Sequence, residues 1–334
     1  MNAKSRVTIL VTDREYEKGK DVFSAESGQA LSFKPAPEDE ALLADQIRAT
    51  GAFGVIAGTA CYQEQLYQAL PKGGIIARFG VGHDGIRKDL AVQYGLYVTN
   101  TPAVLDTSVA EHVVCLMCAL ARNLRTHIAD AFSEKWSPNA GMELKDKTLA
   151  LIGFGRIAKK VAHIAVRGFG MNLIACDMTP YEQHRDFIDG LSGDTSREIR
   201  YTINMEQALA SAIFISIHLP LTAKTQGLLD RSKLAQISKG AYLINTARGG
   251  IVDEIALYDL LATGKLAGAA LDVFAREPYT PSAPDKDLRQ LPNCLLTPHV
   301  ASNTDISNRR MAQCCVANIK AHLAGQVRVL DRVT

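Results

Sequence analysis

The stretch Leu151-Ile-Gly-Phe-Gly-Arg-Ile-Ala158 decides the fold of this 334-residue chain. The apolar run 148–152 predicts a buried strand, and a helical pattern follows the glycines. A second apolar run, 171–176, ends at Asp177. Strand, glycine turn, helix, strand and acidic residue therefore occur in the order of a dinucleotide-binding βαβ unit.

Each position of this motif has a physical reason. Gly153 permits a tight turn, and Gly155 lets the backbone approach a pyrophosphate at the N-terminus of the helix. Ala158 is small enough for the helix to pack closely on the strand. Asp177 is placed to accept hydrogen bonds from the adenosine ribose and to repel a 2′-phosphate, so NAD is predicted rather than NADP. A glycine turn without a ligand is the alternative, and the complete motif argues against it.

Composition excludes several classes of partner. The formal net charge of +2 gives no electrostatic reason to expect nucleic acid or an anionic membrane surface. The apolar run 7–11 near the N-terminus is too short for a signal sequence or a membrane span. Seven cysteines, an odd number, favour free thiols in the cytoplasm. Cys115 and Cys118 fall in an apolar helical pattern, which indicates core packing, and no metal site is predicted.

Two α/β units are expected along the chain. The first hundred residues alternate short apolar runs with helical spacing, which predicts a parallel sheet covered on both faces. Its expected strands are 7–11, 30–33, 54–57, 75–79 and 96–99, and its expected helices are 38–50, 63–70 and 86–94. The second unit has expected strands 148–152, 173–176, 213–217, 241–245 and 268–272, and expected helices 109–124, 157–168 and 253–263. A helical tail, 302–324, follows.

Polar side chains follow three apolar strands of the second unit. They are Arg248, then Asp272 with Glu277 in the next loop, and then His299. Ligands of open α/β sheets bind at the carboxyl ends of the strands, so these positions predict a site. An arginine can bind a carboxylate through two parallel N–H bonds. A glutamate beside a histidine stabilises the imidazolium and fixes its tautomer, which makes an acid/base group. Arg248 alone could equally be an exposed loop residue, and a single histidine after a strand is more often structural than catalytic; the sequence does not show that the three residues meet.

Taken together, the motifs resemble those of the D-isomer-specific 2-hydroxyacid dehydrogenases. The resemblance extends over nearly the whole chain, in family order. Besides Gly153–Ala158 with Asp177, it rests on Phe79–Ile86, Asn100–Pro102, Ala110–His112, His218–Thr222, Asn245–Asp253, Leu271–Phe274 with Glu277-Pro278, and Thr297–His299.

The resemblance implies two doubly wound parallel-sheet domains. A flavodoxin-like substrate domain would comprise residues 1–107 plus 297–334, and a Rossmann NAD-binding domain would comprise residues 108–296. The implied activity is hydride transfer between NAD(H) and a small 2-hydroxy or 2-keto acid. Lactate, glycerate, glyoxylate or hydroxypyruvate, and 3-phosphoglycerate all remain open as substrates.

The resemblance also implies roles for individual residues. Arg248 would bind the carboxylate and carbonyl side of the substrate, His299 would exchange the hydroxyl proton, and Glu277 would orient His299. The backbone N–H groups of Val81 and Gly82 would help to hold the carboxylate. The remaining cofactor contacts would be Arg156 and Ile157 at the pyrophosphate, and Leu219, Thr246, Ala247 and Asp272 beside the nicotinamide.

A homodimer is expected from the same resemblance. The apolar helix 109–124 and the segment with Trp136 lie where this family packs against a second subunit. An ordinary buried core helix is the alternative reading of 109–124. For the activity, the alternative is a non-enzymatic NAD-sensing scaffold of the corepressor type, because such proteins keep the same arginine, glutamate and histidine.

Overall fold

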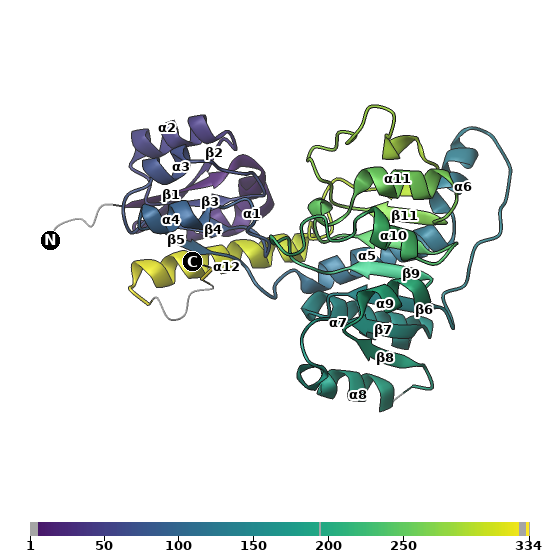
Figure 1. Ribbon diagram of the computed structural model, residues 1–334. Helices are drawn as coiled ribbons and strands as arrows, with labels where there is room; N and C mark the ends of the chain where they lie inside the picture. Colours follow the sequence, from purple (N-terminus) through teal and green to yellow (C-terminus); the bar gives the residue numbers. More distant parts are fainter. Residues whose placement is uncertain (1–5, 194, 327–331, 334) are drawn as a thin grey trace. The chain divides into compact units, whose positions relative to one another are not determined.

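The computed structural model describes residues 6–193, 195–326 and 332–333, and Figure 1 shows its elements. The chain divides into two compact units. One comprises residues 1–105 and 303–334, and the other comprises residues 106–302.

The described residues of the first unit form a five-stranded parallel sheet in the order β2-β1-β3-β4-β5. This is the flavodoxin-like order, with its switch point between β1 and β3. The strands are β1 (Val7–Thr12), β2 (Leu31–Ala36), β3 (Gly54–Ala57), β4 (Ile75–Arg78) and β5 (Tyr97–Thr99). The helices are α1 (Asp13–Glu26), α2 (Glu40–Thr50), α3 (Gln65–Ala69), α4 (Lys88–Gln93) and α12 (Asp305–Leu323).

The C-terminal helix α12 belongs to this first unit, although more than 200 residues separate it from β4 in sequence. It packs against α1 and β4. Its buried side recurs at helical spacing, with Met311, Cys315 and Ile319 among its core residues. The first unit is therefore built from both ends of the chain.

The described part of the second unit contains a seven-stranded parallel sheet in the order β12-β11-β10-β9-β6-β7-β8. The order reverses at β6, which is the arrangement of a Rossmann fold. The strands are β6 (Thr148–Ile152), β7 (Asn172–Cys176), β8 (Ile199–Thr202), β9 (Phe214–Ile217), β10 (Tyr242–Asn245), β11 (Gly268–Leu271) and β12 (Cys294–Leu296). The helices are α5 (Asp106–Ala121), α6 (Leu124–Phe132), α7 (Arg156–His163), α8 (Arg185–Gly193), α9 (Met205–Ser211), α10 (Arg231–Gln236) and α11 (Glu254–Ala262).

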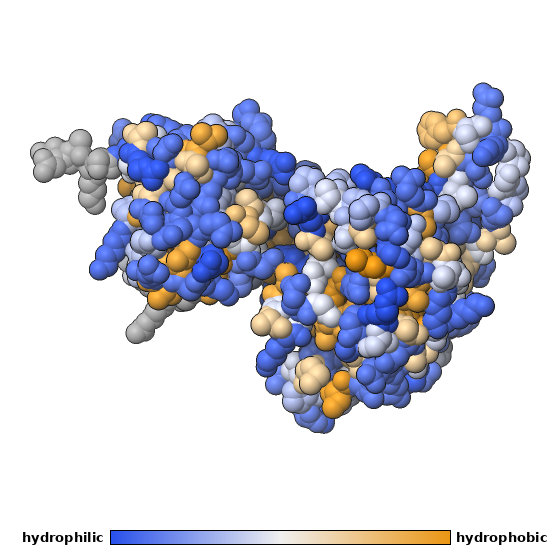
Figure 2. Space-filling model, turned by 45° about the horizontal axis from the view of Figure 1, so that its top comes forward, coloured by the Kyte–Doolittle hydropathy of each residue, from blue (hydrophilic) through white to orange (hydrophobic). Residues whose placement is uncertain are grey.

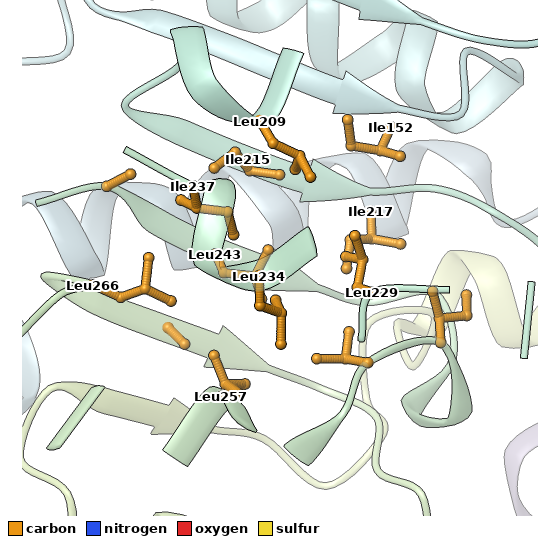
Figure 3. Packing of buried hydrophobic residues seen from close by; sticks show 14 of the residues in the cluster. Ile152, Leu209, Ile215, Ile217, Leu229, Leu234, Ile237, Leu243, Leu257 and Leu266 are labelled. Atoms are coloured by element: carbon orange, nitrogen blue, oxygen red, sulfur yellow. The ribbon is translucent and has the colours of Figure 1, made fainter. Parts of the chain in front are cut away.

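One core cluster of the second unit fills the space between its sheet and α9, α10 and α11. Figure 3 shows Leu209 of α9 beside Ile215 and Leu234 of α10 beside Leu243, and Leu257 of α11 lies in the same cluster. All five side chains are fully buried. The sheet is apolar on this face as well as on the opposite one, as expected for parallel strands covered by helices. The predicted fold class, two doubly wound parallel-sheet domains, is confirmed.

Some expected elements differ from the observed ones. The helix expected at 109–124 is two helices, because Asn123 takes a left-handed conformation with φ of 52° between α5 and α6. The helix expected at 157–168 ends at His163 and continues as a π-helix, Ile164–Gly168. Helix α1 was not expected, because its stretch is largely polar and buries only one large apolar side chain, Phe23.

The expected domain boundary at residue 297 is wrong, because residues 297–302 belong to the second unit. The Thr297 N–H donates to the Leu271 carbonyl at 2.9 Å, and the His299 N–H donates to the Asp272 carbonyl at 2.8 Å. These bonds fix the segment to the end of β11. At the other crossing the second unit begins at Asp106 rather than at 108.

Among the described residues, no helix has the length and apolar character needed to cross a bilayer.

Candidate active site

The glycine turn after β6 leaves room for a phosphate. Gly153 has φ of 90°, and a Cβ there would lie 2.8 Å from the His218 carbonyl oxygen, so only glycine fits. A Cβ on Gly155 would meet nothing within 4 Å, which leaves open space at the start of α7. No side chain caps the N-terminus of α7. These features fit the pyrophosphate of NAD, held by the first N–H groups of the helix.

Asp177 lies at the carboxyl end of β7 beside this turn. Its carboxylate accepts the Phe154 N–H at 2.6 Å and the Thr179 N–H at 2.8 Å. Burial raises the pKa of Asp177, but these hydrogen bonds outweigh it and hold the pKa below its usual range. The side chain therefore remains an anion near neutral pH and can accept further bonds from ribose hydroxyls.

The other expected cofactor residues lie at the same edge of the sheet. Arg156 Nε is 2.8 Å from Asp106 Oδ2. Leu219 packs beside Gly153. The Thr246 hydroxyl is buried and has no hydrogen-bond partner among the described residues, so this polar atom is available to a ligand. The two remaining residues are Ile157, partly buried against the core, and Ala247, whose N–H donates to Asn245 Oδ1 at 3.0 Å.

Glu277 and His299 meet in the structure. Glu277 Oε2 lies 2.7 Å from His299 Nδ1, and Oε1 accepts the Phe274 N–H at 3.0 Å. Burial raises the pKa of Glu277, but the hydrogen bond and charge of His299, the Phe274 N–H and the charge of Arg248 together hold that pKa below its usual range. Glu277 is therefore an anionic partner for the imidazole.

Arg248 comes from the neighbouring strand. The parallel pairing of β10 with β11 brings the segments after both strands to one edge, so Arg248 lies near Glu277. Asn245 Nδ2 donates to the Arg248 carbonyl at 2.9 Å and fixes the turn. The Arg248 guanidinium also donates to the Ala247 carbonyl at 2.7 Å. An arginine, a carboxylate and a histidine therefore converge at the carboxyl ends of β10, β11 and β12.

Asp272, expected beside the nicotinamide, also makes hydrogen bonds within the protein. Its side chain is fully buried. Oδ1 accepts the Thr297 hydroxyl at 2.6 Å and the Val300 N–H at 2.8 Å, and Oδ2 accepts the Ala301 N–H at 2.9 Å. These bonds surround His299, whose φ of 54° lies in the left-handed region. Asp272 thus holds the strained His299 segment in place.

Val81 and Gly82 lie in the first unit, in the loop after β4. Asn100 Nδ2 donates to the Val81 carbonyl at 2.8 Å and fixes the loop. Neither the Val81 nor the Gly82 N–H bonds to any other residue that the structure describes. Both N–H groups are therefore available to an anion.

Two carboxylates that hold segments near the site were not predicted from the sequence. Asp106 binds Arg156, and Glu254 binds Ala275 and Ser282. Each lies in the first turn of a helix, where acidic residues are common for local reasons. Their partners are at least 21 residues away in sequence, so only the folded chain shows what they hold.

Comparison with known proteins settles the family. Residues 114–301 match the family described as D-isomer specific 2-hydroxyacid dehydrogenase, NAD binding domain. A glyoxylate reductase of Korarchaeum cryptofilum is 34% identical over 327 residues, which cover 96% of this chain and 93% of that protein. The chain belongs to the D-isomer specific 2-hydroxyacid dehydrogenase family. It is an NAD-dependent 2-hydroxyacid dehydrogenase, as the sequence motifs predicted.

Solved structures of this dehydrogenase family have the same fold. The NADPH-dependent glyoxylate/hydroxypyruvate reductase of Sinorhizobium meliloti, in complex with NADP and malonate, superposes with a TM-score of 0.79 and 29% identity over 96% of this chain and 94% of that one. The D-lactate dehydrogenase of Aquifex aeolicus, complexed with NAD and lactic acid, gives a TM-score of 0.78 and 27% identity over 96% of each chain. The relatives thus differ in both cofactor and substrate.

Proposed function

We propose that this dehydrogenase interconverts a small 2-keto acid and its 2-hydroxy acid, with His299 as the acid/base group, Glu277 as its partner and Arg248 as the substrate anchor. The contact of 2.7 Å between Glu277 Oε2 and His299 Nδ1 carries this assignment. It engages Nδ1 and leaves Nε2 as the imidazole nitrogen that faces the reaction.

When bound, NADH supplies the hydride that reduces the carbonyl carbon. The oxygen that becomes an alkoxide then takes a proton from Nε2 of the His299 imidazolium. The Glu277 carboxylate stabilises that imidazolium and fixes its ring. In oxidation His299 takes the hydroxyl proton back. His218 is no competitor for this role, because burial lowers its pKa to about 4 and keeps it neutral.

Arg248 supplies the positive charge that an α-keto acid requires. Its guanidinium can bind the carboxylate through two N–H bonds and polarise the adjacent carbonyl. The backbone N–H groups of Val81 and Gly82, in the first unit, are proposed as donors to a substrate carboxylate. Together they would select an acid substrate and orient its carbonyl.

NAD is the proposed physiological cofactor over NADP. Asp177 is an anion at the position where a 2′-phosphate would approach, and like charges repel. Because the relative from Sinorhizobium meliloti is NADPH-dependent, this preference is a property of the individual protein rather than of the family.

A homodimer through the second unit is also proposed. Four large apolar side chains of α6 and the following segment are exposed: Leu124 (43%), Ile128 (53%), Phe132 (89%) and Trp136 (91%). Figure 2 shows a mostly hydrophilic surface with an apolar patch on the projecting part of the second unit near α6. A second copy is the proposed cover for this patch. The structure shows no disulfide among the described cysteines, which supports the proposed cytoplasmic location.

A substrate panel tests the activity. Glyoxylate, pyruvate, hydroxypyruvate and 3-phosphohydroxypyruvate are each offered with NADH, and loss of NADH absorbance is followed. Turnover of at least one keto acid is expected, and Arg248→Ala should abolish most of it. NADH binding without turnover of any keto acid would instead favour the corepressor-type scaffold, which the named relatives do not support.

A further inference from the structure

The loop that follows β11 carries Glu277, and its conformation decides whether this carboxylate reaches His299. The contact with His299 and the Phe274 N–H hold Glu277 itself. Glu277 is too exposed, at 32%, to be fixed by packing alone. A residue other than Glu277 and His299 must therefore fix the conformation of the loop.

Glu254 binds this loop on both sides of Glu277. Its Oε1 accepts the Ala275 N–H at 2.7 Å, and its Oε2 accepts the Ser282 hydroxyl at 2.7 Å. Glu254 is buried, with only 7% of the residue exposed. A buried carboxylate that uses both oxygens on one loop is a strong anchor, since hydrogen bonds to a charged acceptor are about twice as strong as neutral ones.

The position of Glu254 in the fold makes the anchor rigid. It is the first residue of α11, directly after Asp253, whose side chain caps the helix by accepting the Ala256 N–H at 2.9 Å. Helix α11 contributes Leu257 and Leu261 to the core. The carboxylate therefore stands on a fixed element, whereas Glu277 stands on a loop.

We propose that Glu254 is a positioning residue, which holds the loop so that the Glu277 carboxylate stays against His299 and sustains the acid form of the catalytic imidazole. This inference rests on the proposed roles of Glu277 and His299. The hydrogen bonds of the Glu254 carboxylate go to Ala275 and Ser282 of this loop, so its loss should reach the Glu277–His299 pair through the loop.

Other charged groups also face His299 and must be kept constant in any test. Within the second unit they are Glu277 from the loop, Arg248 from the segment after β10, Asp272 at the end of β11, and His112 of α5, whose Nε2 is 3.6 Å from Asp272 Oδ1. Substitution of Glu254 removes none of these groups and none of the contacts described for them above.

The full-length enzyme with its best keto acid tests the inference through the pH profile of kcat/KM. Glu254→Ala removes the hydrogen bonds to both Ala275 and Ser282. The basic limb, where kcat/KM for reduction falls as the pH rises, should then move to lower pH by about half a unit. The KM for NADH should stay unchanged within about twofold. Glu254→Gln keeps an acceptor for Ala275 and a donor for Ser282, so it should restore the wild-type limb. Ser282→Ala removes one anchor and should give a smaller shift in the same direction.

Asp253→Ala is the matched control, because it weakens the same helix end without touching the loop. It should lower the Tm and leave the basic limb in place. If Glu254→Ala does not fold, the pH profile of Ser282→Ala tests the positioning role of Glu254 instead. If the basic limb of kcat/KM stays at its wild-type pH in the folded variants, the positioning role of Glu254 is overturned. An equal shift in Glu254→Ala and Glu254→Gln would show an effect of charge alone, which also overturns it. Failure of Glu277→Gln to move the limb would instead remove the proposed pair itself.

Discussion

The Asp177 carboxylate accepts a hydrogen bond of 2.6 Å from the backbone N–H of Phe154, the residue between the two glycines of the turn. The bond ties the acid at the end of β7 to the turn after β6. It keeps a negative charge where the adenosine ribose would lie. Asp177 therefore holds the turn, and it is the residue proposed to favour NAD over NADP.

NADH should be preferred over NADPH by at least about tenfold in kcat/KM. The reason is that Asp177 accepts bonds from ribose hydroxyls and repels a phosphate, and one bond to a charged group contributes about 1.5–3 kcal/mol. Asp177→Ala should reduce the ratio of the two efficiencies, mainly by raising the KM for NADH. Steady-state kinetics with both cofactors measure this, and equal efficiencies in the wild type would contradict it.

Reduction should fall as pH rises, and oxidation should rise. Reduction needs a protonated imidazole, so it is supported below the basic limb and lost above it, whereas oxidation needs the neutral form. Glu277 has a lowered pKa and is charged throughout this range, so it stabilises the imidazolium. Glu277→Gln should therefore move the basic limb for reduction to lower pH by about one unit. Identical basic limbs in the two proteins would show that the pair does not act as proposed.

His299→Ala should lower kcat by about 10²–10⁴, the usual contribution of a general acid. The KM for NADH should change little, because the residues proposed to bind the cofactor make no side-chain hydrogen bond with His299 in the part of the chain that the structure describes. Tight binding of NADH by the variant, measured by fluorescence, is the control for folding. A variant that keeps most of its kcat would exclude His299 as the acid.

Arg248→Ala should damage both the KM for the keto acid and kcat, because in its proposed role the guanidinium binds the carboxylate and polarises the carbonyl. Arg248→Lys should recover only part of the loss, since an ammonium cannot form two parallel bonds with a carboxylate. Kinetics on the same keto acid separate the two effects. A change confined to KM would limit Arg248 to binding.

A second copy should cover the apolar side chains of α6 and the following segment. The wild-type protein should therefore have a dimer mass at micromolar concentration, and Phe132→Ser combined with Trp136→Ser should favour the monomer. Light scattering coupled to gel filtration measures the mass, and circular dichroism shows that the variant is folded. A monomeric wild type would reject this interface.

The sequence predicted both sheets, because apolar runs and a glycine motif are local signals. It also predicted Arg248, Glu277 and His299 as site residues, since each lies in the segment that follows an apolar run. It did not predict the break at Asn123, where a left-handed residue interrupts an apolar pattern that continues on both sides. Nor could it show which groups the Asp272 carboxylate binds, because these partners lie 25–29 residues away in the chain. Local patterns report strands and site positions, whereas burial and long-range hydrogen bonds decide what each carboxylate does.

Gly249 should tolerate no side chain, whereas its neighbour Gly250 should. A Cβ on Gly249 would lie 1.8 Å from the Phe274 carbonyl carbon, so Gly249→Ala must displace the backbone that leads to Glu277. We expect the free energy of unfolding to fall by about 1–3 kcal/mol. We also expect kcat to fall about 10²-fold, because Glu277 would be displaced from His299.

A Cβ on Gly250 would come no closer than 3.1 Å to its nearest neighbour, the end of the flexible Gln226 side chain. Gly250→Ala should therefore cost less than about 1 kcal/mol and leave kcat nearly unchanged. Denaturant unfolding and kcat, measured on both variants, compare the two glycines directly. Similar losses in both would mean that the contact between Gly249 and the Phe274 peptide does not control the position of Glu277.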